Sequence, residues 1–210
     1  MNKFTHRGIL FVVSAPSGTG KSTLCHNLRQ TPNFVYSVSC TTRVPRHGEE
    51  NGVDYHFLSK EEFERRIQAG DFVEYANVHS NYYGTLLSSV LENITIGRDT
   101  LLDIDVQGAR SIRNHPNRIV RDALADVFIM PPTQEELEKR LRKRGTESEV
   151  DIKKRLAASI DEMALWREYK YTILSESVEE DLMKFRAIMK AERYLSHRLE
   201  FVSSQESQNS

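Results

Sequence analysis

The residues best suited to chemistry lie near the N-terminal end of the chain, in the stretch Ala15-Pro16-Ser17-Gly18-Thr19-Gly20-Lys21-Ser22. An apolar run, Ile9–Val13, precedes this stretch, and a helix-like segment starting at Thr23 follows it. A glycine-rich turn between a strand and a helix lets backbone N–H groups converge on an anion, and the helix N-terminus adds partial positive charge. Lys21 would then reach the β- and γ-phosphates of a nucleoside triphosphate, and the Ser22 hydroxyl would bind Mg²⁺.

One residue departs from the usual phosphate-loop pattern, because Ala15 stands at the first glycine position. Alanine is tolerable there if the position needs no positive φ. The alternative to a phosphate site is a chance glycine-rich turn, but the strand before it and the helix after it favour the phosphate site.

A second group of residues could bind a phosphate monoester. Arg43 and Arg46 lie three residues apart around a proline, and the hydroxyls of Thr41, Thr42, Tyr55 and Tyr83 come from nearby segments. Guanidinium groups bind phosphate with two parallel hydrogen bonds. Taken alone, the pair is more typical of two solvated surface arginines. A triphosphate loop in the same chain reverses that preference, because a phosphate acceptor must be bound as well.

Three carboxylates fall near the ends of predicted strands: Glu74, Asp103 and Asp105. Asp103 ends an apolar run, where an acid next to the water ligands of Mg²⁺ is expected. A purine that carries N–H donors would also need a carboxylate acceptor. The plainer alternatives are a solvated acid on a strand face for Glu74 and helix-capping acids for the other two.

A basic stretch, Lys139–Arg144, is followed by a second one, Lys153–Arg155. On its own it is typical of a solvated helix face or a nucleic-acid patch. However, Arg140 and Arg144 are spaced i,i+4, where like charges are unfavourable unless they share an anion. A lid closing over a triphosphate would provide that anion.

Composition narrows the classes of protein. The chain has 210 residues, of which 39% are hydrophobic and 28% charged, so we expect one ordinary soluble domain with insertions. The net charge of −1 provides no global basic field for duplex nucleic acid. Cys25 and Cys40 form no metal or C-x-x-C pattern and are expected to be reduced, and the histidines receive no role. No membrane span or signal segment is apparent, so we expect a cytoplasmic protein.

The elements that must position these residues alternate between strands and helices, which predicts a parallel sheet with helices on both faces. Expected strands cover 34–39, 53–58, 71–78, 100–105, 126–130 and 171–174. Expected helices cover 59–70, 86–96, 108–114, 133–144, 148–167 and 178–199. Capping patterns at Ser59 and Thr133 are expected to open two of these helices, and Gly70 to close the first. Alternation in 71–78 places Phe72, Glu74, Ala76 and Val78 on one face.

The chain resembles the guanylate kinase family. The motifs that carry the resemblance are Ser14–Thr23, Ser37–Arg46, Gly48–Tyr55, Asn81–Gly84 and Leu102–Gly108, together with Pro131-Pro132 and Lys139–Gly145. The resemblance implies an α/β fold with a P-loop parallel-sheet core (about 8–39, 86–132 and 156–198), a small β-rich GMP-binding insert (about 40–85) and a helical lid (about 133–155). The whole domain would span 7–198, followed by a flexible tail, 199–210.

The resemblance also implies an activity: transfer of the γ-phosphoryl group of ATP to GMP, with Mg²⁺, by a monomer or small homo-oligomer that binds neither membranes nor nucleic acid. ATP would be bound by residues 15–23, including Lys21, Ser22 and Thr23. The GMP phosphate would be held by Arg43, Arg46, Tyr55 and Tyr83, and guanine would be read by Ser39, Glu74, Thr85 and Asp105. The transfer itself would use Lys21, Arg140, Arg144 and Arg155, and Mg²⁺ would be held by Ser22 and, through water, by Asp103.

Two further positions differ from the family pattern, and two alternative functions stay open. Cys40 replaces the Ser or His that relatives often carry, and Ser175-Glu176 replaces a common Asn-Asp, which leaves the adenine contacts open. One rival is a catalytically inactive guanylate-kinase-like protein-binding module, although such modules typically have degraded phosphate loops. The other is a related P-loop kinase for a different phosphorylated small molecule, which would lack acids such as Glu74 and Asp105.

Overall fold

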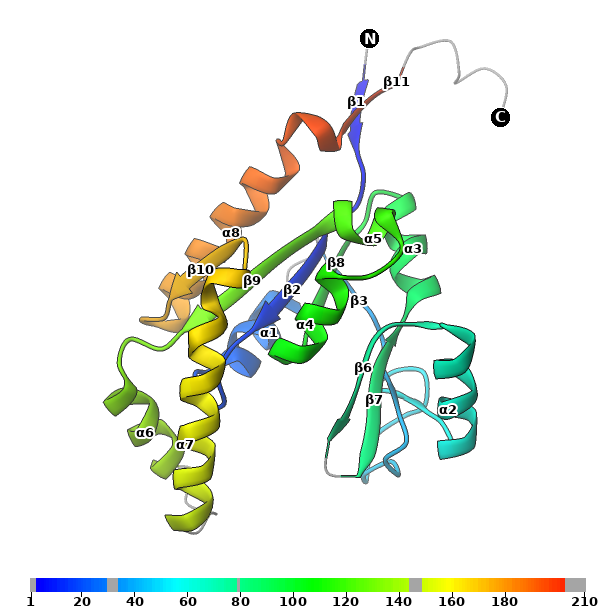
Figure 1. Ribbon diagram of the computed structural model, residues 1–210. Helices are drawn as coiled ribbons and strands as arrows, with labels where there is room; N and C mark the ends of the chain where they lie inside the picture. The colour runs from blue at the N-terminus through cyan, green and yellow to red at the C-terminus, as the bar shows by residue number, and fades with distance from the viewer. Residues whose placement is uncertain (1–2, 30–33, 79, 144–148, 203–210) are drawn as a thin grey trace.

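The computed structural model describes residues 3–29, 34–78, 80–143 and 149–202. At its centre is a five-stranded parallel sheet (Figure 1), as the alternating elements predict. The strand order is β10 (Tyr171–Leu174), β9 (Leu124–Met130), β2 (Leu10–Ser14), β8 (Asp99–Asp103) and β3 (Phe34–Tyr36). Val13 pairs with Asp103, so the segments that follow β2 and β8 leave the sheet at the same edge, where α/β proteins bind ligands.

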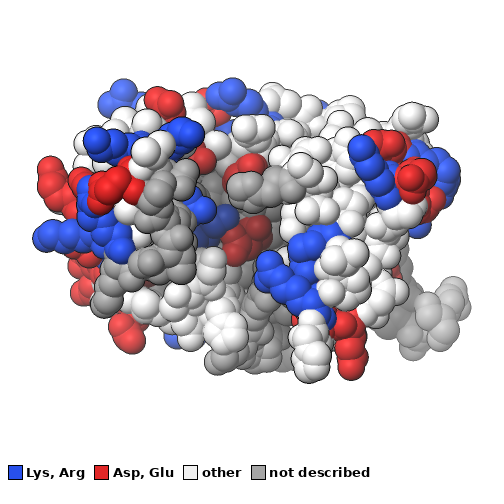
Figure 2. Space-filling view, turned by 90° about the horizontal axis from the view of Figure 1, so that it is seen from below, with Lys and Arg blue, Asp and Glu red and all other residues white. Residues whose placement is uncertain are grey.

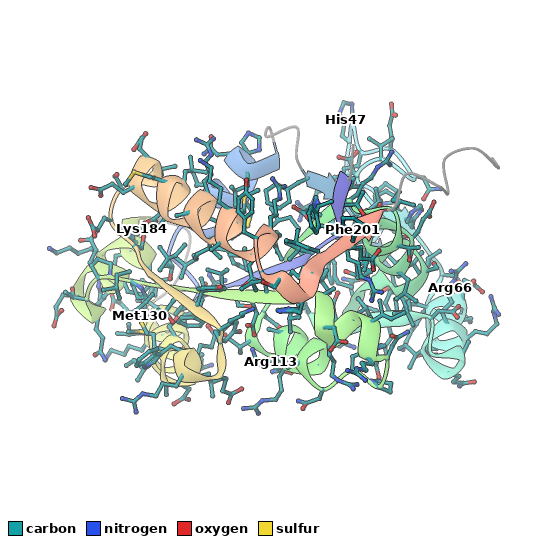
Figure 3. The ribbon with its side chains drawn as sticks, turned by 90° about the horizontal axis from the view of Figure 1, so that it is seen from above. His47, Arg66, Arg113, Met130, Lys184 and Phe201 are labelled. Atoms are coloured by element: carbon teal, nitrogen blue, oxygen red, sulfur yellow. The ribbon has the colours of Figure 1, made fainter. Side chains whose placement is uncertain are left out.

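Helices cover both faces of this sheet. One face packs against α1 (Lys21–Arg29) and α8 (Val178–Arg193), and the other against α3 (Leu87–Thr95), α4 (Val106–Arg113) and α5 (Arg118–Ala123). In β2, Phe11 and Val13 join the first core, and Leu10 and Val12 join the second. All residues of β2 are buried, as expected for a central parallel strand. Figure 3 shows the sheet passing between α8, which carries Lys184, and α4, which carries Arg113.

A second, four-stranded sheet forms the insert. Its order is β5 (His56–Phe57), β4 (Cys40–Thr41), β7 (Asn81–Leu86) and β6 (Phe72–Val78), and α2 (Lys60–Ala69) packs against it. The insert has its own core, in which the Phe63 and Phe72 rings stack with centroids 4.3 Å apart. The caps of α2 are as predicted: the Ser59 side chain accepts from the Glu62 N–H, and Gly70 is left-handed.

Strand β6 corrects one sequence prediction. Its pairing with β7 shifts register between Phe72 and Glu74, which is the signature of a β-bulge. Phe72 therefore packs into the core beside α2, whereas Glu74 lines a cavity together with Ala76 and Val78. The predicted common face was wrong for Phe72, because simple alternation does not continue through a bulge.

The predicted lid, 133–155, contains α6 (Gln134–Lys143) and the first part of α7 (Glu149–Ala164), and a short 3₁₀ turn, η1 (Leu165–Glu168), follows α7. The Thr133 hydroxyl accepts from the Glu136 N–H, as the capping pattern predicts. Arg144, one of the predicted lid arginines, lies outside the described residues.

The structure near the two ends of the chain differs from a second prediction, that of a flexible C-terminal tail. β11 (Leu199–Val202) follows the 3₁₀ turn η2 (Ser196–Arg198) and pairs antiparallel with β1 (Lys3–His6). Phe4 and Phe201 meet edge to face across this ribbon, 5.3 Å apart. The predicted flexible tail was therefore wrong for 199–202, because this strand forms by pairing with β1 at the other end of the chain, a contact that the local sequence does not reveal. Residues 203–210 lie outside the description, and no described helix is long and apolar enough to cross a membrane.

Candidate active site

The loop between β2 and α1 has the conformation of an anion-binding turn. Gly18 and Gly20 adopt φ values of 95° and 100°, which other residues avoid. Among the described residues other than glycine, Ser80 is the one with a positive φ. Ala15 therefore has an ordinary backbone conformation, and alanine is tolerated at this position of the loop. The Thr19 hydroxyl donates to the Pro16 carbonyl oxygen at 2.8 Å and tightens the turn from within.

The lid helix α6 rests on this loop. A Cβ added to Gly18 would lie 3.0 Å from Leu141 and 3.2 Å from Leu137, so glycine allows the close approach. Arg140 Nη1 donates to the Thr19 carbonyl oxygen at 3.0 Å, while its Nε donates to Glu136 at 3.0 Å. The side chain predicted to neutralise the triphosphate therefore already lies at the loop.

Lys21 links the phosphate loop to the end of β8. Its Nζ lies 2.5 Å from Oδ1 of Asp103 and donates to the Ile104 carbonyl oxygen at 2.9 Å. Both ionic side chains are about one-fifth exposed, so the pair is reached by solvent and by ligands.

Glu74 lies in a cavity of about 270 Å³ between the insert and the carboxyl end of β8. Its carboxylate is almost fully buried, and the Thr85 hydroxyl donates to Oε1 at 2.8 Å. Burial raises the pKa of the Glu74 carboxyl to about 7, the Thr85 hydrogen bond opposes that rise, and the nearby Asp105 carboxylate adds to it. A half-ionised acceptor in an enclosed site is suited to a ligand that brings its own N–H donors.

The same cavity gathers most of the predicted acceptor-binding residues. Its lining includes Ser39, Tyr55, Glu74, Tyr83, Asp103 and Asp105. Asp105 also caps α4, because its Oδ1 accepts from the Gly108 N–H at 2.8 Å. A Cβ added at Gly108 would lie 3.2 Å from Glu74 Oε2, so glycine lets α4 lie close to this carboxylate.

Arg43 is held in place beside this cavity. It donates to Oε1 of Glu49 at 2.9 Å and to the Val44 carbonyl oxygen at 2.8 Å, and its guanidinium lies 5.5 Å from the centroid of the Tyr55 ring. Hydrogen bonds to Glu49 and Tyr83 raise the pKa of Arg43, so it stays cationic. Glu49 also accepts from the backbone N–H of Arg46 at 2.7 Å and thereby shapes the loop that carries both arginines.

A second cavity, also of about 270 Å³, lies at the phosphate loop and is lined by residues 15–22, Asp105 and Glu162. Asp105 therefore borders both cavities. Viewed from below (Figure 2), acidic and basic side chains both lie in the hollow between the lid side and the insert side of the molecule. A phosphate donor and a phosphorylated acceptor can thus approach one another along the edge formed by the ends of β2 and β8.

Not every predicted residue reaches these cavities. Among the described residues, Arg46 is exposed and Arg155 is half-buried on α7, and neither lines the acceptor cavity or the phosphate-loop cavity. Thr23 is exposed on the first turn of α1, and Thr85 acts through Glu74. Both cysteines are buried, and burial raises the pKa of the Cys40 thiol to about 11, which favours its protonated form.

Sequence reasoning missed two residues of the site. Glu49 lies within a motif that carries the family resemblance, but an acid in a polar loop gives no sign that it orients an arginine. Glu162 is an acid in the last turn of the charged helix α7, where a solvated side chain is the usual expectation. Its place beside the phosphate loop depends on how α7 packs.

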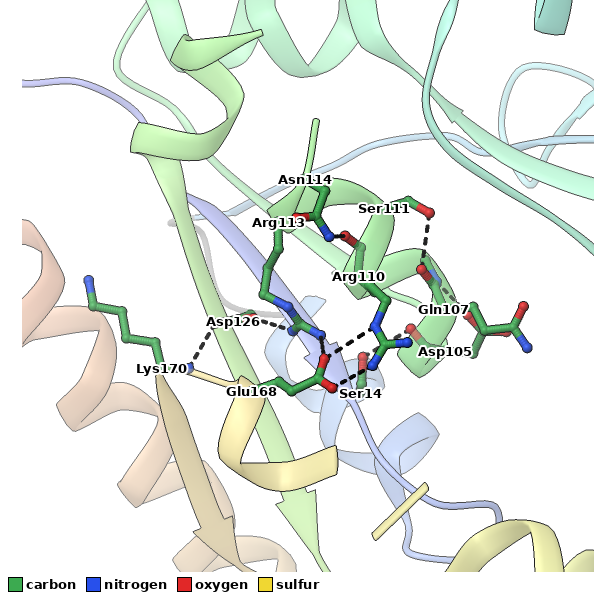
Figure 4. Close-up of polar contacts among 11 residues, drawn as sticks. Ser14, Asp105, Gln107, Arg110, Ser111, Arg113, Asn114, Asp126, Glu168 and Lys170 are labelled. Carbon is green, nitrogen blue, oxygen red and sulfur yellow. Dashed lines mark hydrogen bonds and ion pairs between the residues drawn. The ribbon is translucent and has the colours of Figure 1, made fainter. Parts of the chain in front are cut away.

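An ion-pair network behind the site anchors α4. Arg113 pairs with Asp126 of β9 at 2.6 Å and with Glu168 of η1 at 2.9 Å, and Arg110 joins the same Glu168 carboxylate (Figure 4). The guanidinium of Arg113 also lies 4.5 Å from the centroid of the Tyr169 ring. Because Asp105 caps α4, this network helps to fix the residue that borders both cavities.

Comparisons with known proteins agree with this geometry. The family model described as guanylate kinase matches residues 7–192. The chain belongs to the guanylate kinase family. Relatives of this family include guanylate kinases from Vibrio parahaemolyticus, 47% identical over 190 residues (89% of each chain), and from Clostridium tetani, 44% identical over 188 residues (89% of this chain and 88% of that one). The crystal structure of guanylate kinase from Anaplasma phagocytophilum superposes with a TM-score of 0.71 at 34% identity, covering 93% of this chain and 92% of that chain. The shared fold is that of the guanylate kinase family.

Proposed function

We propose that this protein transfers the γ-phosphoryl group of ATP to GMP, and also to dGMP, giving ADP and the nucleoside diphosphate. The observation that carries the proposal is that Asp105 borders both the phosphate-loop cavity and the cavity containing Glu74. Membership of the guanylate kinase family supports the same substrates. The alternative of an inactive binding module is not favoured, since Gly20, Lys21 and Ser22 form an intact phosphate loop.

Guanine recognition is assigned to Glu74. An ionised carboxylate there can accept from both N1–H and the 2-amino group of guanine, whereas adenine lacks both donors in that arrangement. Thr85 fixes the carboxylate by donating to Oε1. A buried acceptor left unpaired by the wrong base provides strong discrimination, about 10⁴-fold or more.

The acceptor phosphate is assigned to the group around Arg43. Its guanidinium is oriented by Glu49 and Tyr83 and lies against Tyr55, so little side-chain freedom is lost when phosphate binds. Arg46 is proposed to join after the loop adjusts, because it is exposed in the free protein.

Transfer requires no covalent intermediate. The loop N–H groups and Lys21 would hold the β- and γ-phosphates, and the lid arginines Arg140, Arg144 and Arg155 would neutralise charge on the transferred group. Arg140 is the best supported of the three, because it already donates to Thr19. Closure of the lid and insert over the substrates would exclude water and prevent wasteful hydrolysis of ATP.

The residues present fit Mg²⁺. Magnesium prefers oxygen ligands and is usually bound by one or two protein groups together with substrate phosphates. The Ser22 hydroxyl borders the phosphate-loop cavity, and the Asp103 carboxylate lies next to Lys21. In the described part of the chain no cluster of three or more His, Cys, Asp or Glu side chains forms a separate metal site. When bound, Mg²⁺ would neutralise charge on the β- and γ-phosphates.

A base-selection assay tests the proposal. ADP release is measured with ATP and Mg²⁺ against GMP, dGMP, AMP, CMP and UMP. We expect rapid release with GMP and dGMP and very slow release with the other three. Equal rates with all acceptors would contradict the proposal. A cytoplasmic location, the monomer or small homo-oligomer, and the absence of nucleic-acid or membrane partners stay predictions.

A further inference from the structure

One carboxylate at the phosphate loop has no part in the proposed reaction. Glu162 lies on α7, is half-buried, and lines the cavity formed by residues 15–22 and Asp105. Its carboxylate lies near the backbone N–H of Ser17, a loop donor that favours its ionised form. An anionic side chain therefore lies beside a donor of the anion-binding turn, in the cavity assigned to the triphosphate.

Charged groups around Glu162 act on its carboxylate in opposite directions. Lys21 attracts the carboxylate, while Asp105, which lines the same cavity, repels it. Burial raises the pKa of the Glu162 carboxyl, and the Ser17 N–H opposes the rise. A carboxylate offers an N–H donor the same kind of charged oxygen acceptor as a phosphate group does. Glu162 and a triphosphate therefore compete for the same donor, and their charges repel.

We propose that Glu162 is a positioning residue that occupies part of the triphosphate site in the free protein and is displaced when ATP binds. The proposal rests on the assignment of the phosphate loop as the ATP site.

Competition of this kind makes a specific prediction about affinity. When the binding-competent state is a fraction of the free protein, the apparent Kd rises by the inverse of that fraction. If Glu162 occupies the loop in about 70–90% of free molecules, its removal lowers the Kd for ATP about three- to tenfold. A side chain with a merely structural role would weaken or leave unchanged the binding of ATP, so a gain in affinity is the diagnostic result.

The test compares Glu162→Gln and Glu162→Ala with the wild type by isothermal titration calorimetry, using a non-hydrolysable ATP analogue with Mg²⁺. Asp161→Asn is the matched control, since it removes one charge from an exposed neighbour on the same helix. We expect both Glu162 variants to bind the analogue about three- to tenfold more tightly, with an unchanged Kd for GMP and a lower KM for ATP. The control should match the wild type.

Unchanged or weaker analogue binding by a folded Glu162 variant would overturn the proposal. A second measurement uses the wild type alone: in protein labelled with ¹³C at glutamate carboxyls, the Glu162 signal should shift on addition of the analogue and stay in place on addition of GMP. A signal that ignores the analogue would also overturn the proposal. If the wild type itself makes no GDP from ATP and GMP, the proposed function fails instead, so the two failures are distinguishable.

Discussion

Nζ of Lys21 lies 2.5 Å from Oδ1 of Asp103, so the two groups assigned to the triphosphate and to Mg²⁺ are paired with each other. The pair keeps the lysine at the boundary between the phosphate loop and the end of β8, because the same ammonium donates to the Ile104 carbonyl oxygen. Binding of a metal–triphosphate complex can exchange each charge for an equivalent partner, which lowers the net electrostatic cost of opening the pair.

Replacing Lys21 with alanine tests that arrangement. Lys21→Ala should lower kcat by at least about 10²-fold, because the transferred charge loses a pre-positioned cation. The fold should persist, since the side chain reaches solvent and contributes little to either core. Steady-state kinetics and thermal melting check both statements, with Lys60→Ala on α2 as a control for the loss of a lysine. A kcat near that of the wild type would contradict the assigned role.

The raised pKa of Glu74 predicts how GMP binding depends on pH. With a pKa of about 7, the ionised fraction falls about tenfold between pH 8 and pH 6, and only the ionised carboxylate accepts from both guanine donors. The KM for GMP should therefore rise about tenfold over that range, while the KM for ATP changes much less. Initial rates at fixed saturating ATP measure this dependence.

Glu74→Gln provides the control for the titration of the GMP phosphate itself, which also loses a proton near pH 6. The variant should have a higher KM for GMP than the wild type at pH 8 and a weaker pH dependence. Identical pH profiles for the two proteins would mean that another group titrates.

The same pKa predicts an effect on stability in the free protein. Between the ordinary value of 4.5 and about 7, the folded state holds a proton that the unfolded state has released, so the free energy of unfolding falls as pH rises. The contribution is on the order of 2–3 kcal/mol. Thermal melting at pH 5 and pH 8 should therefore show a larger loss for the wild type than for Glu74→Gln. Parallel melting curves at both pH values would contradict the buried, proton-binding state of Glu74.

Phosphate binding by the acceptor is tested at Arg43. Arg43→Ala should raise the KM for GMP by about 10- to 100-fold, because an oriented guanidinium makes charge-assisted hydrogen bonds with phosphate. Tyr83→Phe, which removes only a hydroxyl that contacts Arg43, should have a smaller effect in the same direction. Arg65→Ala on α2 is the matched control. A larger effect on the KM for ATP than for GMP would contradict the assignment.

The sequence was informative where chemistry and local geometry coincide. The phosphate loop is continuous in the chain, so its strand, glycines, Lys21 and helix could be predicted together. Fully apolar runs predicted the central parallel strands, and the Ser59 and Thr133 caps were correct because capping is a local interaction. The assignment of guanine to Ser39, Glu74, Thr85 and Asp105 came from the family resemblance rather than from spacing.

The rest depended on contacts between distant segments. The bulge that turns Glu74 toward the cavity arises from the pairing of β6 with β7. α5 was missed because a six-residue helix has little periodicity, and β1 and β11 form only through each other. The roles of Glu49 and Glu162 follow from where their carboxylates lie, since an acid in a polar segment is usually solvated.

The central claim is that the buried carboxylate of Glu74 selects guanine. The most direct test is the ratio of kcat/KM for GMP to that for AMP, measured at pH 8 in the wild type and in Glu74→Gln. We expect a ratio of about 10⁴ or more in the wild type and a loss of at least about 10²-fold in the variant, because a neutral amide presents only one acceptor to guanine. An unchanged ratio in the folded variant would contradict the claim.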